Sequence, residues 1–361
     1  MKICLISVEI FAWGKYGGFG RATRTIGREL IRRGVEVYAV VPQRKNQRAR
    51  ESLDGITVLS FPPLLPWKAT KLFQACNADI YHSCEPSFLS YLALKAMPHK
   101  KHIATIRDPR DFSDWKMEFK LPSLNRFQVI FNYFFENNIF VRHSIKNMDG
   151  VYATALDLIP KIKKIYQLHQ APEFLPTPVS VPSSIKKAKE PIVCYLARLD
   201  RRKRPTIFLD LAEKFPHVKF IAIGKSRDKS WEAHLRRSYA GLPNLEFAGF
   251  VDQFTSNELN LLLSQSWIMI NTATREGLPN SFLEAAAAGC AILSHVDTDG
   301  FASRFGYHAR IDDFEEGLRY LLENDRWRER GEKGYQYVRN TFEMESSIKK
   351  HIDIYTRLMT L

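Results

Sequence analysis

Arg275-Glu276-Gly277-Leu278-Pro279-Asn280-Ser281-Phe282-Leu283-Glu284 is the stretch that says most about the fold and chemistry of this chain. Proline suits the start of a helix far better than its interior, so Pro279 predicts a helix that begins near Asn280. Glu276 then lies on the preceding loop and Glu284 on the first turns. The exposed N–H groups of such a helix end suit a phosphate, and carboxylates accept hydrogen bonds from ligand hydroxyls without a metal. Taken alone, the spacing also fits a capped surface helix with two solvated acids.

The composition bounds the class of protein. A chain of 361 residues with 45% hydrophobic content fits two domains with packed cores. No apolar run reaches the length of a bilayer crossing, and the first residues resemble a strand rather than a secretory signal. The five cysteines are scattered, which indicates reduced thiols without a zinc site or disulfide framework. We therefore expect a cytoplasmic protein, with peripheral attachment to the inner face of the membrane as a further option.

The net charge of +14 favours anionic partners such as nucleic acid, acidic lipid or phosphorylated substrates. The basic residues are spread along the chain and do not form one tail. We therefore expect no nucleic-acid partner. A basic nucleic-acid-binding protein stays as an alternative, and it would show steep salt-dependent binding.

Short apolar strands alternate with amphipathic helices, which is typical of parallel α/β architecture. The expected strands are residues 2–8, 35–41, 56–61, 79–82, 102–106, 150–153, 192–196, 218–223, 245–247, 267–270 and 291–294. A proline-rich and then polar segment interrupts the alternation. We therefore predict one α/β domain over 1–172, a linker over 173–190 and a second α/β domain over 191–343, with a helix over 344–361 that packs back on the first. Ligands of such folds bind at the carboxyl ends of the strands.

A glycine-rich loop, Trp13-Gly14-Lys15-Tyr16-Gly17-Gly18-Phe19-Gly20, lies between the first strand and the following helix. Glycines let the backbone turn tightly and approach a ligand closely. The second strand ends in Val40-Val41-Pro42 without a carboxylate for a ribose, so a dinucleotide site is not favoured. Gly17 and Gly18 are candidates for ligand contact, and a purely structural loop fits equally well.

A basic turn, Ala197-Arg198-Leu199-Asp200-Arg201-Arg202-Lys203-Arg204, opens the second domain. Arg198 follows a strand and Lys203 precedes the next helix, so both can point toward a ligand at the strand ends. Arginine offers a planar fork to a diphosphate and lysine a compact charge. Two fixed cations would offset the charge on a departing nucleotide diphosphate. A solvated basic turn is the alternative interpretation.

With these three motifs in this order, the chain resembles retaining glycosyltransferases of the GT-B fold and is similar to glycosyltransferase family 4 (group 1). That family carries a Gly-Gly loop, a Gly-Arg-Leu-x-x-x-Lys-Gly turn and a Glu-x7-Glu motif. They correspond here to Gly17-Gly18, to residues 197–204, and to Glu276 with Glu284. The resemblance covers nearly the whole chain. It implies an α/β fold of two Rossmann-like domains facing each other across a cleft, with the acceptor bound by the first and the nucleotide-sugar donor by the second.

The resemblance also implies residue roles. Arg198, Lys203 and Glu276 would form the catalytic set. The donor-binding residues would be Gly17, Gly18, Arg198, Lys203, Glu276, Gly277, Leu278, Pro279, Asn280 and Glu284, with Glu284 on the ribose and Glu276 on the donor sugar. The implied reaction is a hexosyl transfer that keeps the anomeric configuration, without a cofactor besides the nucleotide-sugar substrate. We expect it to be metal-independent, because Arg198 and Lys203 already supply the cations.

The chain departs from the family pattern in three places. Arg107, in Ile106-Arg107-Asp108-Pro109, stands where members often have a histidine. Arginine keeps its proton near neutral pH, so Arg107 can bind a hydroxyl or phosphate but cannot be a general base. Ala197 and Arg204 replace the glycines of the basic turn, and Asp299-Gly300-Phe301 replaces a Gly-Gly-x-x-Glu. The acceptor-side candidates are His82, Arg107 and Asp108, with a structural role as the alternative for His82.

Residues 124–146 are rich in aromatic side chains and carry Arg126, Arg142 and Lys146 near the ends. Such a segment is either a core helix or one that lies on an anionic membrane surface. With the basic balance, we expect a membrane-surface enzyme acting on a glycan or lipid-linked acceptor in cell-surface polysaccharide biosynthesis. A nucleotide-sugar epimerase or sugar phosphorylase of the same architecture is the alternative. It differs in whether products form without an acceptor glycan.

Overall fold

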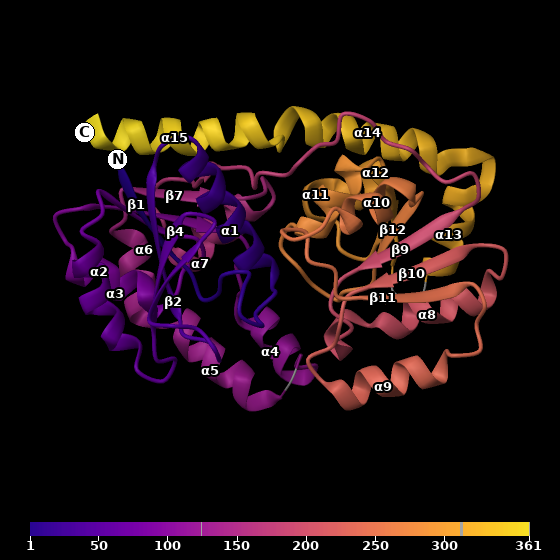
Figure 1. Ribbon diagram of the computed structural model, residues 1–361, viewed down its shortest axis with the longest axis horizontal. Coiled ribbons are helices and arrows are strands. Elements are labelled where there is room, and N and C mark those ends of the chain that lie inside the picture. The colour runs from indigo at the N-terminus through magenta and orange to yellow at the C-terminus, as the bar shows by residue number, and fades with distance from the viewer. Residues whose placement is uncertain (124, 311–312, 361) are drawn as a thin grey trace. The chain divides into compact units, whose positions relative to one another are not determined.

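The computed structural model describes residues 1–123, 125–310 and 313–360, whose elements are shown in Figure 1. The chain forms two compact units, the first made of residues 1–111, 130–178 and 344–361, the second of residues 112–129 and 179–343. Residues 112–129 thus lie with the second unit, although the sequence analysis placed them within 1–172. The predicted linker 173–190 contains the point, between residues 178 and 179, where the chain passes from one unit to the other.

The first unit holds an eight-stranded sheet in the order β3-β4-β2-β1-β5-β6-β7-β8. Its strands are β1 (Lys2–Ile6), β2 (Glu36–Pro42), β3 (Arg50–Leu53), β4 (Ile56–Phe61), β5 (Ile80–Ser83), β6 (Lys101–Ile106), β7 (Gly150–Ala153) and β8 (Glu173–Phe174). All neighbours pair in parallel except β3, which is antiparallel to β4. The two edge strands, β3 and β8, were not predicted from the sequence, because both are short and lack an apolar run.

Helices cover this sheet, and α15 (yellow in Figure 1) contributes to its core. The helices that lie in the first unit are α1 (Gly18–Arg32), η1 (Pro66–Lys68), α2 (Ala69–Cys76), α3 (Phe88–Ala96), α6 (Ile139–Lys146), α7 (Leu158–Tyr166) and α15 (Met344–Thr360), while α5 (Arg126–Glu136) begins in the second unit and ends in the first. Ile348, Tyr355 and Leu358 of α15 are buried in one cluster with Leu5 and Ile26. The last helix is therefore part of the first core.

The second unit holds a six-stranded, fully parallel sheet in the order β11-β10-β9-β12-β13-β14. Its strands are β9 (Ile192–Leu196), β10 (Lys219–Ile223), β11 (Leu245–Gly249), β12 (Ile268–Asn271), β13 (Ala291–Ser294) and β14 (Gly306–His308). Its helices are α4 (Phe112–Lys120), η2 (Arg201–Lys203), α8 (Pro205–Lys214), α9 (Lys229–Ser238), α10 (Glu258–Gln265), α11 (Asn280–Ala287), η3 (Thr298–Gly300), α12 (Phe301–Phe305), α13 (Phe314–Leu322), η4 (Glu323–Asp325) and α14 (Arg326–Thr341). Tyr195, Phe208, Phe220 and Trp327 fill its core.

Both sheets contain a point at which the strand order changes direction. It lies between β1 and β5 in the first sheet and between β9 and β12 in the second. Loops that leave neighbouring strands there run in opposite directions, so ligands of such sheets bind at this point beyond the carboxyl ends. In the second unit the two loops are residues 197–204 and 272–279, which carry the basic turn and the start of the Glu-x7-Glu motif.

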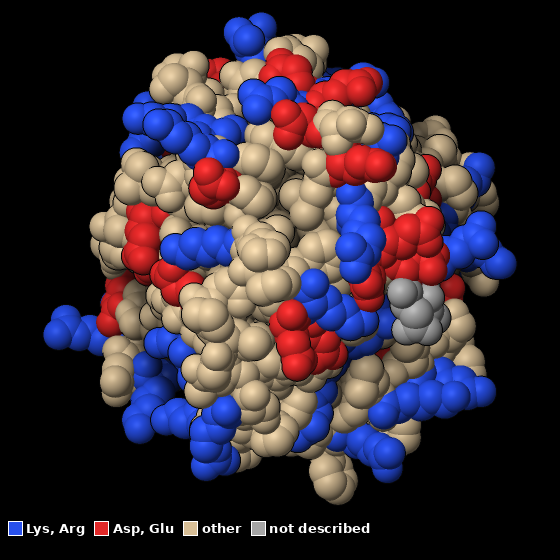
Figure 2. Space-filling view, turned by 90° about the vertical axis from the view of Figure 1, so that its right-hand side faces the viewer, with Lys and Arg blue, Asp and Glu red and all other residues tan. Residues whose placement is uncertain are grey.

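Two surface properties bear on partners. Figure 2 shows a face on which Lys and Arg are mixed with Asp and Glu instead of forming one basic field. In the part of the chain that the structure describes, no helix has both the length and the apolar character needed to cross a membrane.

Candidate functional site

An ion pair joins the two motifs of the second unit. Lys203 Nζ, in η2 after β9, lies 2.6 Å from Oε1 of Glu276, on the loop after β12. The two loops meet because β9 and β12 are neighbouring parallel strands. The Asn271 side-chain amide, at the end of β12, donates a hydrogen bond to the same oxygen at 3.0 Å. Glu276 Oε2 can therefore accept a hydrogen bond from a ligand hydroxyl.

Burial acts against the charge on each member of this pair. It lowers the pKa of Lys203, an effect that Arg202 reinforces and Glu276 opposes. For Glu276, burial alone would raise the pKa, but the Lys203 ammonium and the Asn271 amide together bring that pKa below its ordinary value. The site therefore presents an ionised carboxylate and an ammonium at neutral pH.

Backbone contacts fix the basic turn. The Thr272 hydroxyl donates to the carbonyl oxygens of Lys203 at 2.6 Å and Arg204 at 2.9 Å, and the Arg204 Nε–H donates to the Thr272 carbonyl at 2.6 Å. Arg204 occupies the left-handed region with φ 47°, which is unfavourable for a side chain larger than glycine. This explains why the family pattern has glycine there. In this chain the hydrogen bonds with Thr272 hold the strained backbone.

Ala197, which stands where the family pattern has the other glycine, lies against Gly224 at the end of β10. A Cβ on Gly224 would come within 2.0 Å of the Ala197 carbonyl oxygen, and its φ is +145°. The close backbone contact therefore requires glycine on the neighbouring strand, while position 197 itself accepts alanine.

A buried carboxylate orients Arg198. Arg198 Nη1 lies 3.0 Å from Oδ2 of Asp200, whose side chain is fully buried. Asp200 Oδ1 accepts hydrogen bonds from the Arg227 N–H at 3.1 Å and the Ser226 hydroxyl at 3.3 Å. The Arg198 side chain keeps 27% exposure, so it is positioned yet reachable by a ligand. Asp200 was not among the residues predicted from the sequence, although its place inside the basic turn was a signal.

The helix expected near Asn280 begins at that residue and is α11, with Pro279 preceding it in an extended conformation. Gly277, Leu278 and Pro279 are buried, whereas Asn280 and Glu284 are partly exposed. The Gly277 carbonyl accepts a hydrogen bond from the Thr298 hydroxyl at 3.0 Å. Thr298 belongs to Asp297-Thr298-Asp299, an Asp-x-Asp sequence that the sequence analysis passed over. Within the described residues, no three or more His, Cys, Asp or Glu side chains are grouped to hold a metal ion.

Residues beside the two motifs bind helix α4. Arg275 Nε lies 2.8 Å from Oδ1 of Asp114, and Arg202 Nη1 lies 2.5 Å from Oε1 of Glu118. Arg275 Nη1 also approaches Glu118 at 3.5 Å. Asp114 and Glu118 are buried at 7% and 8% exposure. These ion pairs attach residues 112–129 to the second unit, a long-range arrangement for which the sequence carries no local pattern.

In the first unit, the amino end of α1 already holds a carboxylate. Glu9 Oε1 accepts a hydrogen bond from the Gly20 N–H at 3.2 Å. Gly17 is the N-cap and Gly18 the first residue of α1. A Cβ on Gly17 would lie 1.9 Å from Glu9 Oε1, so the missing side chain makes room for this carboxylate. An acid at this end of a helix is electrostatically favourable.

His82 lies inside the first unit with no exposed surface. Its Nδ1 is 2.7 Å from the Tyr355 hydroxyl and its Nε2 is 2.7 Å from the Thr105 hydroxyl. Burial, followed by the interactions with His351 and Arg107, lowers its pKa well below the ordinary value, so the ring is neutral. These partners are typical of a structural histidine, the alternative that the sequence left open.

Arg107 and Asp108 follow β6. Arg107 is 6% exposed, its Nη1 donates to the Thr177 hydroxyl at 2.5 Å, and its backbone N–H donates to Glu85 at 2.9 Å. Burial raises the pKa of Glu85 to about 8. Asp108 Oδ2 lies 3.2 Å from Arg110 Nε. Glu85, which follows β5, is a polar residue at a strand end that the sequence analysis did not select.

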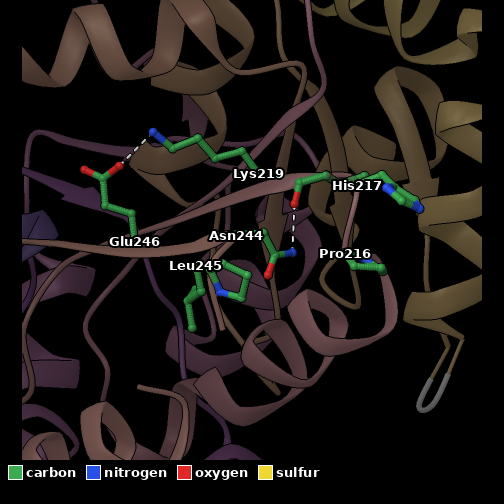
Figure 3. A pocket seen from close by; sticks show the side chains of 8 residues that line it. Pro216, His217, Lys219, Asn244, Leu245 and Glu246 are labelled. Carbon is green, nitrogen blue, oxygen red and sulfur yellow. Dashed lines mark hydrogen bonds and ion pairs between the residues drawn. The ribbon is translucent and has the colours of Figure 1, made fainter. Parts of the chain in front are cut away.

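A separate hollow lies at the end of the second sheet where the strands begin (Figure 3). It is lined by Pro216, His217, Val218, Lys219, Pro243, Asn244, Leu245 and Glu246. Lys219 and Glu246 form an ion pair of 2.8 Å across it, and Asn244 donates to the Val218 carbonyl at 2.9 Å. Because Lys219 and Leu245 begin β10 and β11, this hollow is at the amino ends of the strands, away from the motif residues.

Two family descriptions match the chain. Glycosyl transferases group 1 matches residues 180–337 and Glycosyltransferase Family 4 matches residues 16–158. No curated protein matches the chain.

Many solved structures share the fold. The sucrose-phosphate synthase of Thermosynechococcus elongatus is 15% identical with a TM-score of 0.75, over 99% of both chains. Anabaena HepE in complex with UDP-glucose is 14% identical with a TM-score of 0.70, over 99% of this chain and 100% of that one. The pneumococcal O-GlcNAc transferase GtfA in complex with UDP and GlcNAc is 9% identical with a TM-score of 0.71, over 99% of both chains. With its two Rossmann-like units and the paired motifs of the second, the chain belongs to the group 1, family 4-like glycosyltransferases of the GT-B fold.

Proposed function

We propose that this glycosyltransferase moves a hexosyl-type sugar from a nucleotide-sugar to a hydroxyl of a glycan or lipid-linked saccharide, with retention of anomeric configuration. The observation that carries the donor half is the Lys203–Glu276 ion pair of 2.6 Å, on two loops that flank the point where the sheet order changes direction. Solved relatives in complex with UDP-glucose or UDP support a nucleotide-sugar donor.

In this proposal the diphosphate binds Arg198 and Lys203. Arg198 is held by buried Asp200 with 27% of its side chain exposed, so its guanidinium can form two parallel hydrogen bonds to phosphate oxygens. The N–H groups at the start of α11 add a partial positive charge. These fixed charges stabilise the diphosphate as the glycosidic bond breaks.

The carboxylates bind the sugars at either end of the diphosphate. Glu276 uses Oε1 for Lys203 and Asn271, which leaves Oε2 for a donor-sugar hydroxyl. Glu284, partly exposed on α11, accepts from the ribose hydroxyls. Arg107 and Asp108 of the first unit bind acceptor hydroxyls, and His82 supports them from the interior.

The acceptor hydroxyl attacks on the face that the diphosphate leaves, and a donor phosphate oxygen takes its proton. This route needs no nucleophile from the protein. It is therefore compatible with a Glu276 carboxylate whose charge is offset by Lys203. No metal ion is invoked, because Lys203 and Arg198 supply the positive charge that the leaving group needs. The acceptor belongs to cell-surface polysaccharide biosynthesis.

Donor binding tests the site. Calorimetry with UDP should show a loss of affinity of about tenfold or more for Lys203→Gln, because a charge-assisted hydrogen bond contributes about 1.5–3 kcal/mol. Lys214→Gln is the matched control, since Lys214 is 55% exposed and pairs with Glu315 on the surface. Equal affinity of the Lys203→Gln variant and the wild type, with both proteins folded, would remove the diphosphate assignment.

Product analysis tests the reaction. The donor is identified by measuring the Tm of the protein with each of a panel of UDP-, GDP- and ADP-sugars, because a bound donor raises the Tm. Proton NMR of the product then reads the anomeric configuration. Inversion contradicts the proposed stereochemistry, and product formed without an acceptor glycan, or only with inorganic phosphate, indicates an epimerase or a phosphorylase.

A further inference from the structure

The connection between β6 and β7 is longer than the fold requires. β6 ends at Ile106 and β7 begins at Gly150, although neighbouring parallel strands need a single crossover helix. Helix α6 supplies that crossover, because its residues Val141 and Ile145 are buried and it packs against α3. Helices α4 and α5 are additional elements, and α4 is attached through its ion pairs to the loops that carry the two motifs.

Helix α5 faces outward with its apolar side. Val129 is its one buried residue along Arg126–Glu136, all of which is described. Phe127, Ile130, Phe131 and Phe134 are exposed by 83%, 42%, 53% and 66%. Their spacing places them on one face of the helix. The core interpretation of this aromatic helix is therefore wrong for α5: the stripe that would normally enter a core is on the surface.

The start of α6 continues this exposure. Ile139 and Phe140 are exposed by 76% and 47%. The Phe140 ring also contacts the Tyr91 ring of α3, with 4.9 Å between the ring centroids. The start of α6 is therefore packed on the first unit. Soluble monomeric proteins rarely expose apolar side chains in such numbers on one surface unless a partner covers them.

Among the described residues of 112–146, the exposed charges have one sign. The acids of this stretch are turned toward arginines: Asp114 and Glu118 contact Arg275 and Arg202, and Glu136 lies 3.2 Å from Arg110. Among the described residues of 112–146, the exposed charged side chains are Lys116, Lys120, Arg126, Arg142 and Lys146. A second copy of this chain would bring like charges together, whereas anionic headgroups complement them.

We propose that α5 and the start of α6 dock this protein on an anionic lipid bilayer. The apolar stripe enters the boundary between headgroups and acyl chains, while Arg142 and Lys146 contact headgroup phosphates. Helix α5 spans about 16 Å, which suits a helix lying in the surface. Docking does not depend on the proposed sugar transfer, and it is measured without donor or acceptor.

The test is co-sedimentation of the full chain with vesicles of phosphatidylcholine, alone or with one third phosphatidylglycerol. We expect binding to the anionic vesicles that weakens at high salt. F131S/F134S should weaken this binding by at least about tenfold. Burying a phenylalanine side chain contributes about 1.5–3 kcal/mol, and each serine removes part of that contribution. Leu261→Ser is the matched control, since Leu261 is 58% exposed on α10 in the second unit.

R142Q/K146Q should weaken binding roughly thirty-fold, because each cation near the surface contributes about 1 kcal/mol. Lys349→Gln, an exposed lysine on α15, should change nothing. Thermal unfolding shows that all variants are folded. Equal binding of F131S/F134S and the wild type, or equal binding to neutral and anionic vesicles, overturns the proposal. A dimer in lipid-free solution that F131S/F134S dissociates would also overturn it, because a second copy would then cover the stripe.

Discussion

Glu276→Gln should change nucleotide binding and sugar transfer in opposite directions. In the protein alone, Glu276 is the counter-ion of Lys203 at 2.6 Å. Glutamine keeps the shape of the side chain and removes the charge. Lys203 is then available to a diphosphate without competition, whereas a donor-sugar hydroxyl loses a carboxylate acceptor.

The size of each effect follows from the geometry. A hydrogen bond to a charged group contributes about 1.5–3 kcal/mol. The Lys203 and Glu276 side chains are 10% and 21% exposed, so solvent weakens their pairing only in part. We expect UDP to bind the variant about threefold to tenfold more tightly. With a UDP-sugar and acceptor, kcat/KM should fall roughly tenfold to a hundredfold.

Calorimetry with UDP and steady-state kinetics with a UDP-sugar measure the two effects on one preparation. Glu315→Gln is the control, because Glu315 pairs with Lys214 at 2.8 Å on the surface and both side chains are well exposed. If UDP affinity and kcat/KM fell by the same factor at an unchanged Tm, the carboxylate would not compete with the diphosphate and the assigned roles would be refuted.

Three further substitutions address the supporting structure. Gly17→Ala should cost about 1–3 kcal/mol of unfolding free energy in urea, because its Cβ would lie 1.9 Å from a carboxylate oxygen, whereas Gly241→Ala, with nothing within 4 Å, should be neutral. His351 is neutral in the folded protein because burial, followed by the charge of a neighbouring arginine, lowers its pKa to about 3. The unfolded chain binds that proton below pH about 6.5, so wild-type stability relative to His351→Leu should fall by about 1.4 kcal/mol per unit from pH about 6 to about 4; a pH-independent difference contradicts this. Asp114→Asn should cost about 3 kcal/mol of unfolding free energy, because Arg275 loses its nearer buried partner at 2.8 Å while the Glu118 oxygen stays 3.5 Å away, and hydrogen exchange should rise in α4.

Local sequence patterns were sufficient to predict the features that depend on residues close together in the sequence. Pro279 predicted the start of α11, and the sequence placed the basic turn at a strand end and Glu276 on the loop before that helix. That the two loops are neighbours became known only from the pairing of β9 with β12. The alternation of strands and helices predicted two parallel α/β domains, and the resemblance of the motifs to a glycosyltransferase family implied the GT-B fold. Polar residues such as Asn271 and Asp200, which hold Glu276 and Arg198, stand at strand ends or in the turn and were within reach of the same reasoning.

Long-range contacts and the burial of individual side chains could not be predicted from the sequence. The spacing of Phe127, Ile130, Phe131 and Phe134 is the same for a helix that packs in a core and for one that faces solvent, so only the structure distinguishes them. The carboxylate of Glu9 at the start of α1 is equally invisible, because its contact with Gly20 depends on how the loop folds back.

The course of the chain has a consequence for dissecting this enzyme. The backbone passes between the units at residues 111/112, 129/130, 178/179 and 343/344. A fragment limited to residues 179–343 would therefore leave out α4 and strip Arg202 and Arg275 of their counter-charges. Nucleotide affinities measured on such a truncation would report an artificially electropositive surface, whereas a permuted chain that tethers residues 112–129 would preserve the native charge balance.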